Sequence, residues 1–317
     1  MRFPDPRRIA TNGIELAVHS VGSGPPVVLC HGFPELAYSW RYQLPALAAA
    51  GFTAHAPDMR GFGQSDKPQG VEKYDIRTLC ADLCGLLDNL DLGQALFVGH
   101  DWGAILLWQF ALLYPERVQA LVNMNVPFYP RTPVDPVPKM REILSDDFYI
   151  ANFQLSREAD DAFDADPQRF FESVMRRRPI TREQFDAIPA SKKRPYSMLR
   201  SMRKSTFPGE PLLSNEDLQV FVEAYRNGGF TPPINWYRNW TRNWEITEGV
   251  TQRVTVPTLF IGARDDVLIA PHHIEAMHRY VDKLDVVMID ECGHWTQQEK
   301  PDEVNRLLVG WLNQYKH

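Results

Sequence analysis

The sequence contains little cysteine. Four of its 317 residues are cysteine (Cys30, Cys80, Cys84 and Cys292), and no two of them form a CxxC pair. The usual zinc-binding and thioredoxin-like patterns are therefore missing. Four cysteines in a chain of this length also make a disulfide framework implausible. We expect these thiols to be small buried side chains.

Long hydrophobic runs and a surplus of basic residues are also missing. No apolar run approaches the roughly 18 residues of a membrane-spanning helix, and the first residues lack the apolar core of a secretory signal. The net charge is −6, whereas nucleic-acid-binding proteins usually carry a basic surplus. At 44% hydrophobic and 23% charged residues, the composition excludes a disordered or fibrous chain. We expect a cytoplasmic enzyme with no nucleic-acid or membrane partner.

Proline is abundant, and its placement divides the chain. Five of the 25 prolines fall within residues 127–138, a density that excludes a strand or a helix interior and indicates a stiff connector. Short β-branched, apolar runs before it predict buried strands at 25–30, 52–58, 95–100 and 120–126. A helical pattern at 78–90 lies between two of them, and Asn12-Gly13 predicts a hairpin near the N-terminus. This alternation predicts βαβ units and a mostly parallel sheet.

The pattern after the connector is helical from about 139 to 245. Basic runs at 176–178 and 192–194 lie near acidic residues and are interpreted as solvated surface. Strand signals return at 255–263 and 285–290, and a last helix is predicted at 303–315. We therefore predict an α/β core domain, residues 1–130 and 250–317, interrupted by a helical cap at 131–249. The cap is expected over the carboxyl edge of the sheet, where open α/β sheets bind ligands.

The most informative motif is Gly99-His100-Asp101-Trp102-Gly103. It follows a predicted strand and precedes a predicted helix, as the nucleophile elbow G-x-Nuc-x-G does, with aspartate in the nucleophile position. A simple turn with a helix-capping aspartate would give the same local pattern. The residues that follow favour the elbow.

An acid and a histidine occur after this motif in the order that the elbow requires. Asp265 follows the strand at 255–263, and His294 follows the strand at 285–290. Asp101, Asp265 and His294 are thus expected to meet at one sheet edge as a catalytic triad. Asp266 lies in the same loop as Asp265 and is the alternative acid.

The loop His31-Gly32-Phe33-Pro34 follows the strand at 25–30. In this type of fold that loop supplies one N–H of an oxyanion hole, and the residue after the nucleophile supplies the other. The predicted donors are therefore the backbone N–H groups of Phe33 and Trp102. Pro34 permits a cis peptide bond, which the sequence does not decide.

An aspartate nucleophile implies a particular chemistry. A carboxylate is already ionised at neutral pH, so it can attack a saturated carbon without first losing a proton. The product is an alkyl ester on the enzyme, which the histidine can then hydrolyse by activating water. Epoxides, haloalkanes and haloacids are the substrates that suit this chemistry.

Several stretches together resemble the α/β-hydrolase-fold epoxide hydrolases, close to the soluble type. They are HGFPELAYSWRYQLPALAAAGF, PDMRGFGQSDKP, GHDWGA, GARDDVL and ECGHWTQQEKP. The resemblance implies an epoxide substrate, water as co-substrate and no metal or organic cofactor. It also implies two cap tyrosines that protonate the leaving oxygen. Tyr237 in NWYRN is the match for one and Tyr149 in DDFYIANFQ for the other, with Tyr129 as the fallback.

Other assignments follow from proximity in the sequence. His31, Pro34, Trp40, Trp236 and Trp295 are the predicted residues of the substrate pocket. The alternative enzyme is a haloalkane dehalogenase with the same triad, and the non-catalytic alternative is a binding protein on the same scaffold. The sequence leaves the choice between a monomer and a homodimer open.

Overall fold

The computed structural model describes residues 2–316. Its main feature is an eight-stranded sheet in the order β1-β2-β4-β3-β5-β6-β9-β10, in which β2 runs antiparallel to both neighbours and the other pairs are parallel. The strands are β1 (Pro6–Thr11), β2 (Ile14–Gly22), β3 (Pro26–Cys30), β4 (Thr53–Pro57), β5 (Ala95–His100), β6 (Val118–Met124), β9 (Thr258–Ala263) and β10 (Leu284–Ile289). The predicted mostly parallel sheet is confirmed.

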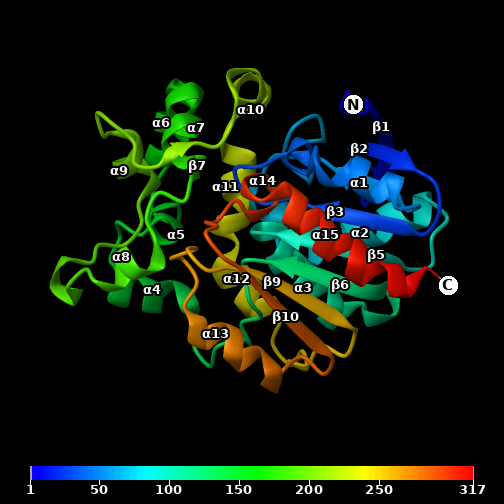
Figure 1. Ribbon diagram of the computed structural model, residues 1–317. Coiled ribbons are helices and arrows are strands. Elements are labelled where there is room, and N and C mark those ends of the chain that lie inside the picture. The colour runs from blue at the N-terminus through cyan, green and yellow to red at the C-terminus, as the bar shows by residue number, and fades with distance from the viewer. Residues whose placement is uncertain (1, 317) are drawn as a thin grey trace.

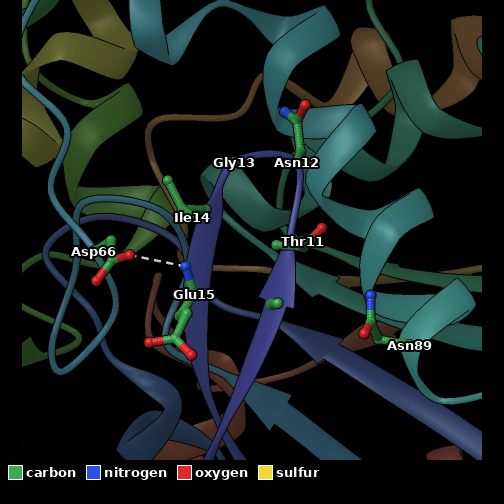
Figure 2. Close-up of a pocket in the computed structure, with 8 residues that line it drawn as sticks. Thr11, Asn12, Gly13, Ile14, Glu15, Asp66 and Asn89 are labelled. Carbon is green, nitrogen blue, oxygen red and sulfur yellow. Dashed lines mark hydrogen bonds between the residues drawn. The ribbon is translucent and has the colours of Figure 1, made fainter.

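The N-terminal hairpin forms at the predicted turn. Asn12 and Gly13 both adopt positive φ, at 22° and 75°, as a tight hairpin turn requires. An open pocket lies at this hairpin, where Asp66 accepts a hydrogen bond from the Glu15 backbone N–H at 2.8 Å (Figure 2). That pocket contains none of the predicted site residues.

Successive residues of the central strands point to opposite faces of the sheet and bury two separate clusters. Val28 and Phe97 pack with α2 (Ile76–Asn89) and α3 (Trp102–Leu113) on one face. Leu29 and Val98 pack with α1 (Gln43–Ala49) and α15 (Pro301–Leu312) on the other. Because both faces are covered by helices, the strands are apolar throughout rather than alternating.

The chain leaves the sheet after β6 and returns at β9. Between them lie α4 (Pro136–Leu144), α5 (Tyr149–Asn152), α6 (Glu158–Ala165), α7 (Pro167–Val174), α8 (Arg182–Asp186), α9 (Met198–Met202), α10 (Asn215–Gly228), α11 (Thr231–Arg238) and α12 (Trp240–Ile246). Two strands of two residues each, β7 (Arg176–Arg177) and β8 (Glu210–Pro211), pair antiparallel within the same segment. The helices α4 to α9 lie to one side of the sheet, on the left in Figure 1. The domain boundaries at 131 and 249 stay predictions.

The proline-rich connector differs from its prediction at its end. Residues 127–135 are irregular, but Pro136 opens helix α4, with Asp135 accepting a hydrogen bond from Val137 N–H as the N-cap. Proline is tolerated in a first helical turn because its missing N–H would have no helical partner there. The predicted connector therefore ends three residues early.

Two helices complete the carboxyl side of the sheet. Helix α13 (Pro271–Ala276) follows the loop after β9, and α14 (Thr296–Glu299) follows the loop after β10. Among the described residues no helix is long and apolar enough to cross a membrane. The four cysteines are free thiols, and all but the half-buried Cys84 are buried.

Candidate active site

Asp101 sits on a strained turn between β5 and α3. Its φ is 53° and its ψ is −122°, an unfavourable region for a residue with a side chain. Strand β5 ends at His100 and helix α3 begins at Trp102, so the turn has a single residue. This is the elbow geometry that the GHDWG motif predicts.

Two glycines allow the elbow to pack tightly. A Cβ on Gly103 would overlap the carbonyl oxygen of Cys30, at the end of β3. A Cβ on Gly32 would overlap Oδ1 of Asp101 and crowd the Trp102 backbone N. Larger residues at either position would therefore separate the nucleophile from the loop after β3.

The loop after β3 binds one oxygen of Asp101. The backbone N–H of Phe33 donates to Oδ1 of Asp101 at 2.7 Å, and the Phe33–Pro34 peptide bond is cis. This hydrogen bond is the one expected of the first oxyanion-hole donor. The second donor, the Trp102 N–H, stays a prediction.

His294 reaches the nucleophile from the loop after β10. Its Nε2 lies 3.6 Å from Oδ2 of Asp101, and its Nδ1 lies 2.8 Å from Oδ2 of Asp266. The carboxylate that orients His294 is therefore Asp266. The prediction of Asp265 was wrong, and the alternative in the same loop is the one that the geometry supports.

Asp265 points to the cap instead of to His294. Its Oδ1 accepts a hydrogen bond from the Arg182 backbone N–H at 2.8 Å, and its Oδ2 lies 3.5 Å from Nη1 of Arg178. A turn between Ala263 and Asp266 follows β9 and separates the directions of the two side chains. Two adjacent aspartates in a loop give no periodic signal, so the sequence could not decide between them.

Asp266 is buried and well supplied with donors. Besides His294, Nδ2 of Asn125 donates to its Oδ2 at 2.8 Å and the Leu268 N–H donates to its Oδ1 at 3.1 Å. Burial alone would raise the pKa of Asp266, but the positive charge of His294 and these hydrogen bonds hold that pKa below its ordinary value. Asn125, which follows β6, is a site residue that the sequence analysis missed.

The pKa of His294 is raised well above its ordinary value. Burial acts in the opposite direction, but the carboxylates of Asp266 and Asp101 stabilise the imidazolium and outweigh it. One of those two charges belongs to the nucleophile. The proton affinity of His294 therefore depends on the charge of Asp101.

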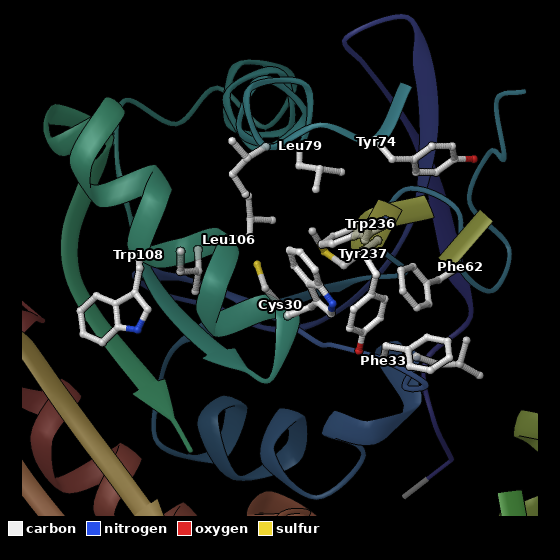
Figure 3. Packing of buried hydrophobic residues seen from close by; sticks show 14 of the residues in the cluster. Cys30, Phe33, Phe62, Tyr74, Leu79, Leu106, Trp108, Trp236 and Tyr237 are labelled. Atoms are coloured by element: carbon white, nitrogen blue, oxygen red, sulfur yellow. The ribbon is translucent and has the colours of Figure 1, made fainter. Parts of the chain in front are cut away.

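The two predicted cap tyrosines come together. The rings of Tyr149 and Tyr237 lie 5.6 Å apart, and Tyr237 also packs edge-on against Phe33 and Trp102 at 5.5 Å and 5.1 Å. Tyr237 joins the apolar cluster shown in Figure 3. Burial, and then the charge of Asp101, raise the pKa of both phenols well above 10, so both keep their protons at neutral pH. The fallback, Tyr129, is 43% exposed, and its hydroxyl lies near His273.

Two of the predicted pocket residues have other roles. Trp40 is fully buried in the cluster on the opposite face of the sheet from Phe33 and Trp102. His31 uses both ring nitrogens on the backbone: its Nε2 accepts from Met59 N–H at 3.0 Å and its Nδ1 lies 2.9 Å from the Gly32 carbonyl. The prediction that these two residues line the substrate pocket was wrong. Trp40 belongs to the hydrophobic core, and His31 holds the loop after β3 in place.

The other predicted pocket residues lie nearer to the site. Trp236 packs edge-on against Trp102 at 5.6 Å and donates to the Arg60 carbonyl at 3.0 Å. Trp295 packs on the ring of His294 at 4.8 Å. For these two tryptophans and for Pro34, contact with substrate stays a prediction.

A buried ion pair behind the nucleophile was also missed. Nδ1 of His100 lies 2.7 Å from Oε2 of Glu35, and its Nε2 lies 2.8 Å from the carbonyl oxygen of His294. Each ring nitrogen of His100 thus faces an oxygen atom, one of the Glu35 carboxyl group and one of the His294 carbonyl. Burial opposes ionisation of Glu35, but the charge of His100 outweighs it and lowers the pKa of Glu35 to about 2. Glu35 and His100 are 65 residues apart, and no local pattern connects them.

A nucleophile elbow, an acid and a histidine at the carboxyl edge of a mostly parallel sheet define an α/β hydrolase. The family described as the α/β hydrolase fold matches residues 25–301, and the chain belongs to that family.

Similar proteins within the family are epoxide hydrolases. Epoxide hydrolase A of Mycobacterium tuberculosis is 40% identical over 98% of this chain and 98% of its own length. The crystal structure of epoxide hydrolase A from Mycobacterium thermoresistibile has a TM-score of 0.87 at 39% identity, covering 98% of each chain. Bifunctional epoxide hydrolase 2 of Sus scrofa is 39% identical over 95% of this chain. The chain spans about half the length of that relative, 53%.

Proposed function

We propose that the chain hydrolyses epoxides to vicinal diols through an ester on Asp101. The observation that carries the proposal is the constellation around this carboxylate. The Phe33 N–H donates to Oδ1, and His294 lies 3.6 Å from Oδ2. The charge of the Asp101 carboxylate also contributes to the raised pKa of the two cap tyrosines, Tyr149 and Tyr237. Epoxide hydrolases similar over the full length support the same activity.

Ring opening needs a nucleophile and an acid. Since Oδ1 is bound to the Phe33 N–H, Oδ2 is the oxygen that attacks the oxirane carbon. The new bond joins Oδ2 to carbon while the oxirane carbon–oxygen bond breaks. The leaving oxygen takes a proton from Tyr149 or Tyr237, whose raised pKa keeps that proton available. The tyrosinate recovers a proton from solvent.

Hydrolysis of the ester needs a base. Esterification removes the negative charge of Asp101, which is one of the causes of the raised pKa of His294. His294 can then lose its proton and accept one from water, whose oxygen adds to the Asp101 carboxyl carbon. The Phe33 N–H stabilises the negative charge that develops on Oδ1. The ester bond breaks and the diol oxygen takes the proton from His294. The Asp101 carboxyl group then gives the second proton of the water to His294, which restores the carboxylate beside a protonated imidazole.

A trapping experiment tests the proposal. The variant His294→Gln, incubated with styrene oxide, should gain the mass of one substrate molecule because it can open the ring but cannot hydrolyse the ester. The variant Asp101→Ala should show no gain and no turnover. If wild-type enzyme forms diol while His294→Gln shows no adduct, a covalent mechanism is excluded.

Haloalkane dehalogenation is the second candidate, and one observation favours it. The indole N–H of Trp102 is buried and forms no hydrogen bond of full geometry among the described residues, although it lies close enough to the Tyr237 hydroxyl to act against the rise in the pKa of that phenol. An indole donor at this position would stabilise a departing halide. Halide release from 1-bromobutane without diol formation from epoxides would decide for this candidate.

A further inference from the structure

A short piece of the cap lies against both loops that carry the base and its acid. We call residues 174–182 the cap arm. On the histidine loop, Trp295 Nε1 donates to the Val174 carbonyl at 3.2 Å and Arg177 donates to the Glu299 carbonyl at 3.4 Å. On the acid loop, the Arg182 N–H donates to Asp265 at 2.8 Å. Arg177 is exposed and Arg176 and Arg178 are half-buried, so the interpretation of residues 176–178 as solvated surface holds only in part.

Arg182 makes the closest connection with the acid loop. Its Nη2 donates to the carbonyl oxygens of Asp266 at 2.6 Å and of Ile269 at 2.5 Å, while its backbone N–H binds Asp265. The side chains of Arg182 and Asp265 are 18% and 12% exposed, so these bonds are largely shielded from water. Hydrogen bonds with a charged partner are strong in such surroundings.

The held loop contains the residue on which His294 depends. The backbone carbonyl of Asp266 accepts a hydrogen bond from Arg182, and its side chain is hydrogen-bonded to His294. A displacement of the cap arm would therefore move the Asp266 carboxylate relative to the imidazole. Asp101 and the two tyrosines, by contrast, make no hydrogen bond with Arg182 or Asp265 among the described residues.

We infer that Arg182 and Asp265 are positioning residues for the hydrolytic half of the reaction: they fix Asp266 to the cap arm and so hold His294 in line for ester hydrolysis. The inference rests on the proposed two-step function. Ring opening uses Asp101 and the tyrosines, whereas ester hydrolysis uses Asp266 and His294. Loss of the hydrogen bonds of the Arg182 guanidinium with the acid loop, or of the Asp265 carboxylate with the Arg182 N–H, should therefore slow the second step selectively.

Single-turnover measurements separate the two steps. Quenched-flow samples of enzyme with styrene oxide, read by intact-protein mass spectrometry, give the rate of adduct formation and the rate of adduct loss. In Arg182→Met and Asp265→Ala we expect adduct loss to slow by between about 10- and 100-fold, since misplacement near 1 Å has effects of that size. Adduct formation should stay within about threefold of wild type, so the ester accumulates during turnover.

Conservative and control variants sharpen the test. Asp265→Asn keeps an oxygen for the Arg182 N–H and should recover most of the hydrolysis rate lost in Asp265→Ala. Arg203→Gln removes a cap arginine whose partner is the exposed Glu158, and both steps should match wild type. If Arg182 and Asp265 act through one connection, the double variant should be no slower than the slower single variant.

Two results would overturn the inference. Equal slowing of adduct formation and adduct loss in Arg182→Met and Asp265→Ala would show a general structural role. Unchanged hydrolysis in folded variants, checked by circular dichroism, would show no role. Failure of the proposed function is a separate result, because it would appear as missing diol and missing adduct in the wild-type enzyme.

Discussion

His294 Nδ1 lies 2.8 Å from Oδ2 of Asp266, whose carboxylate is almost fully buried, and the second half of the proposed reaction depends on this pair. The carboxylate holds the ring so that Nε2 faces Asp101, 3.6 Å away. It also compensates the positive charge that His294 gains when it takes a proton from water. Asp265, one residue earlier, has neither function.

The two adjacent aspartates should therefore respond differently to the same substitution. In the ester intermediate, where Asp101 has no charge, Asp266→Asn leaves His294 without a charged partner, and we expect ester hydrolysis to fall at least about 100-fold. Asp265→Asn should lower it by less than about tenfold, because the amide oxygen can still accept from the Arg182 N–H. The check is the steady-state fraction of alkylated enzyme with styrene oxide, read by mass. Equal adduct levels in the two variants would contradict the assignment.

The tyrosines should control the first half of the reaction. Tyr237→Phe and Tyr149→Phe each remove one proton donor, and we expect the rate of adduct formation to fall by about 100-fold in each. The rate of adduct loss should not change, because His294 and Asp266 remain.

The leaving oxygen supplies the control for this prediction. An epoxide with an electron-withdrawing substituent, such as epichlorohydrin, gives a less basic alkoxide and depends less on an acid. Both Phe variants should therefore lose less activity on epichlorohydrin than on 1,2-epoxybutane. Equal losses on the two substrates would mean that the phenols only shape the pocket.

The sequence was sufficient for the parts of the site that follow from local pattern. Asp101 could be found because strand, single-residue turn and helix each have their own signature, and His294 because it follows the last strand. Asp265 and Asp266 could not be separated, since no period distinguishes neighbours in a turn. The direction of each is set by tertiary contacts, Arg182 for one and Asn125 for the other.

Contacts between distant segments could not be predicted either, because they too depend on tertiary structure that no local sequence pattern encodes. Trp40 was placed in the pocket because it is near the HGFP loop in sequence, yet it packs on the other face of the sheet. The pairing of Glu35 with His100 depends on β3 and β5 being neighbours in the sheet, which a single sequence does not reveal. The sheet order decides both.

The two steps should differ in their dependence on pH. The tyrosines act in their protonated form, and burial with the charge of Asp101 raises their pKa well above 10. Adduct formation should therefore show no loss as pH rises to about 10. Ester hydrolysis needs neutral His294, so its rate should rise with pH and then level off. Single-turnover rates from pH 6 to about 10 give both profiles, and adduct formation that fell with a midpoint below about pH 9 would exclude the phenols as acids.

The buried pair Glu35–His100 should make the stability of the protein depend on pH in the acid range. The folded-state pKa of Glu35, about 2, lies below its ordinary value of 4.5. A lowered carboxyl pKa stabilises the folded state above the unfolded-state pKa, and this stabilisation is lost as pH falls through the folded-state value. Glu35→Gln should therefore lower the free energy of unfolding by about 3 kcal/mol at neutral pH. That deficit should shrink as pH falls below about 4.5.

Urea unfolding of wild type and Glu35→Gln between pH 8 and about 3 measures this difference. The matched control is Glu142→Gln, which removes a carboxylate whose partner is the exposed Lys139 and should change stability by less than about 0.5 kcal/mol. A deficit for Glu35→Gln that stayed constant down to pH 3 would show that the cost comes from packing. A deficit that shrinks, as expected, would assign the lost stability to the charge on Glu35. The Glu35 carboxyl group is the one group that can gain a proton in wild type and is missing from the variant.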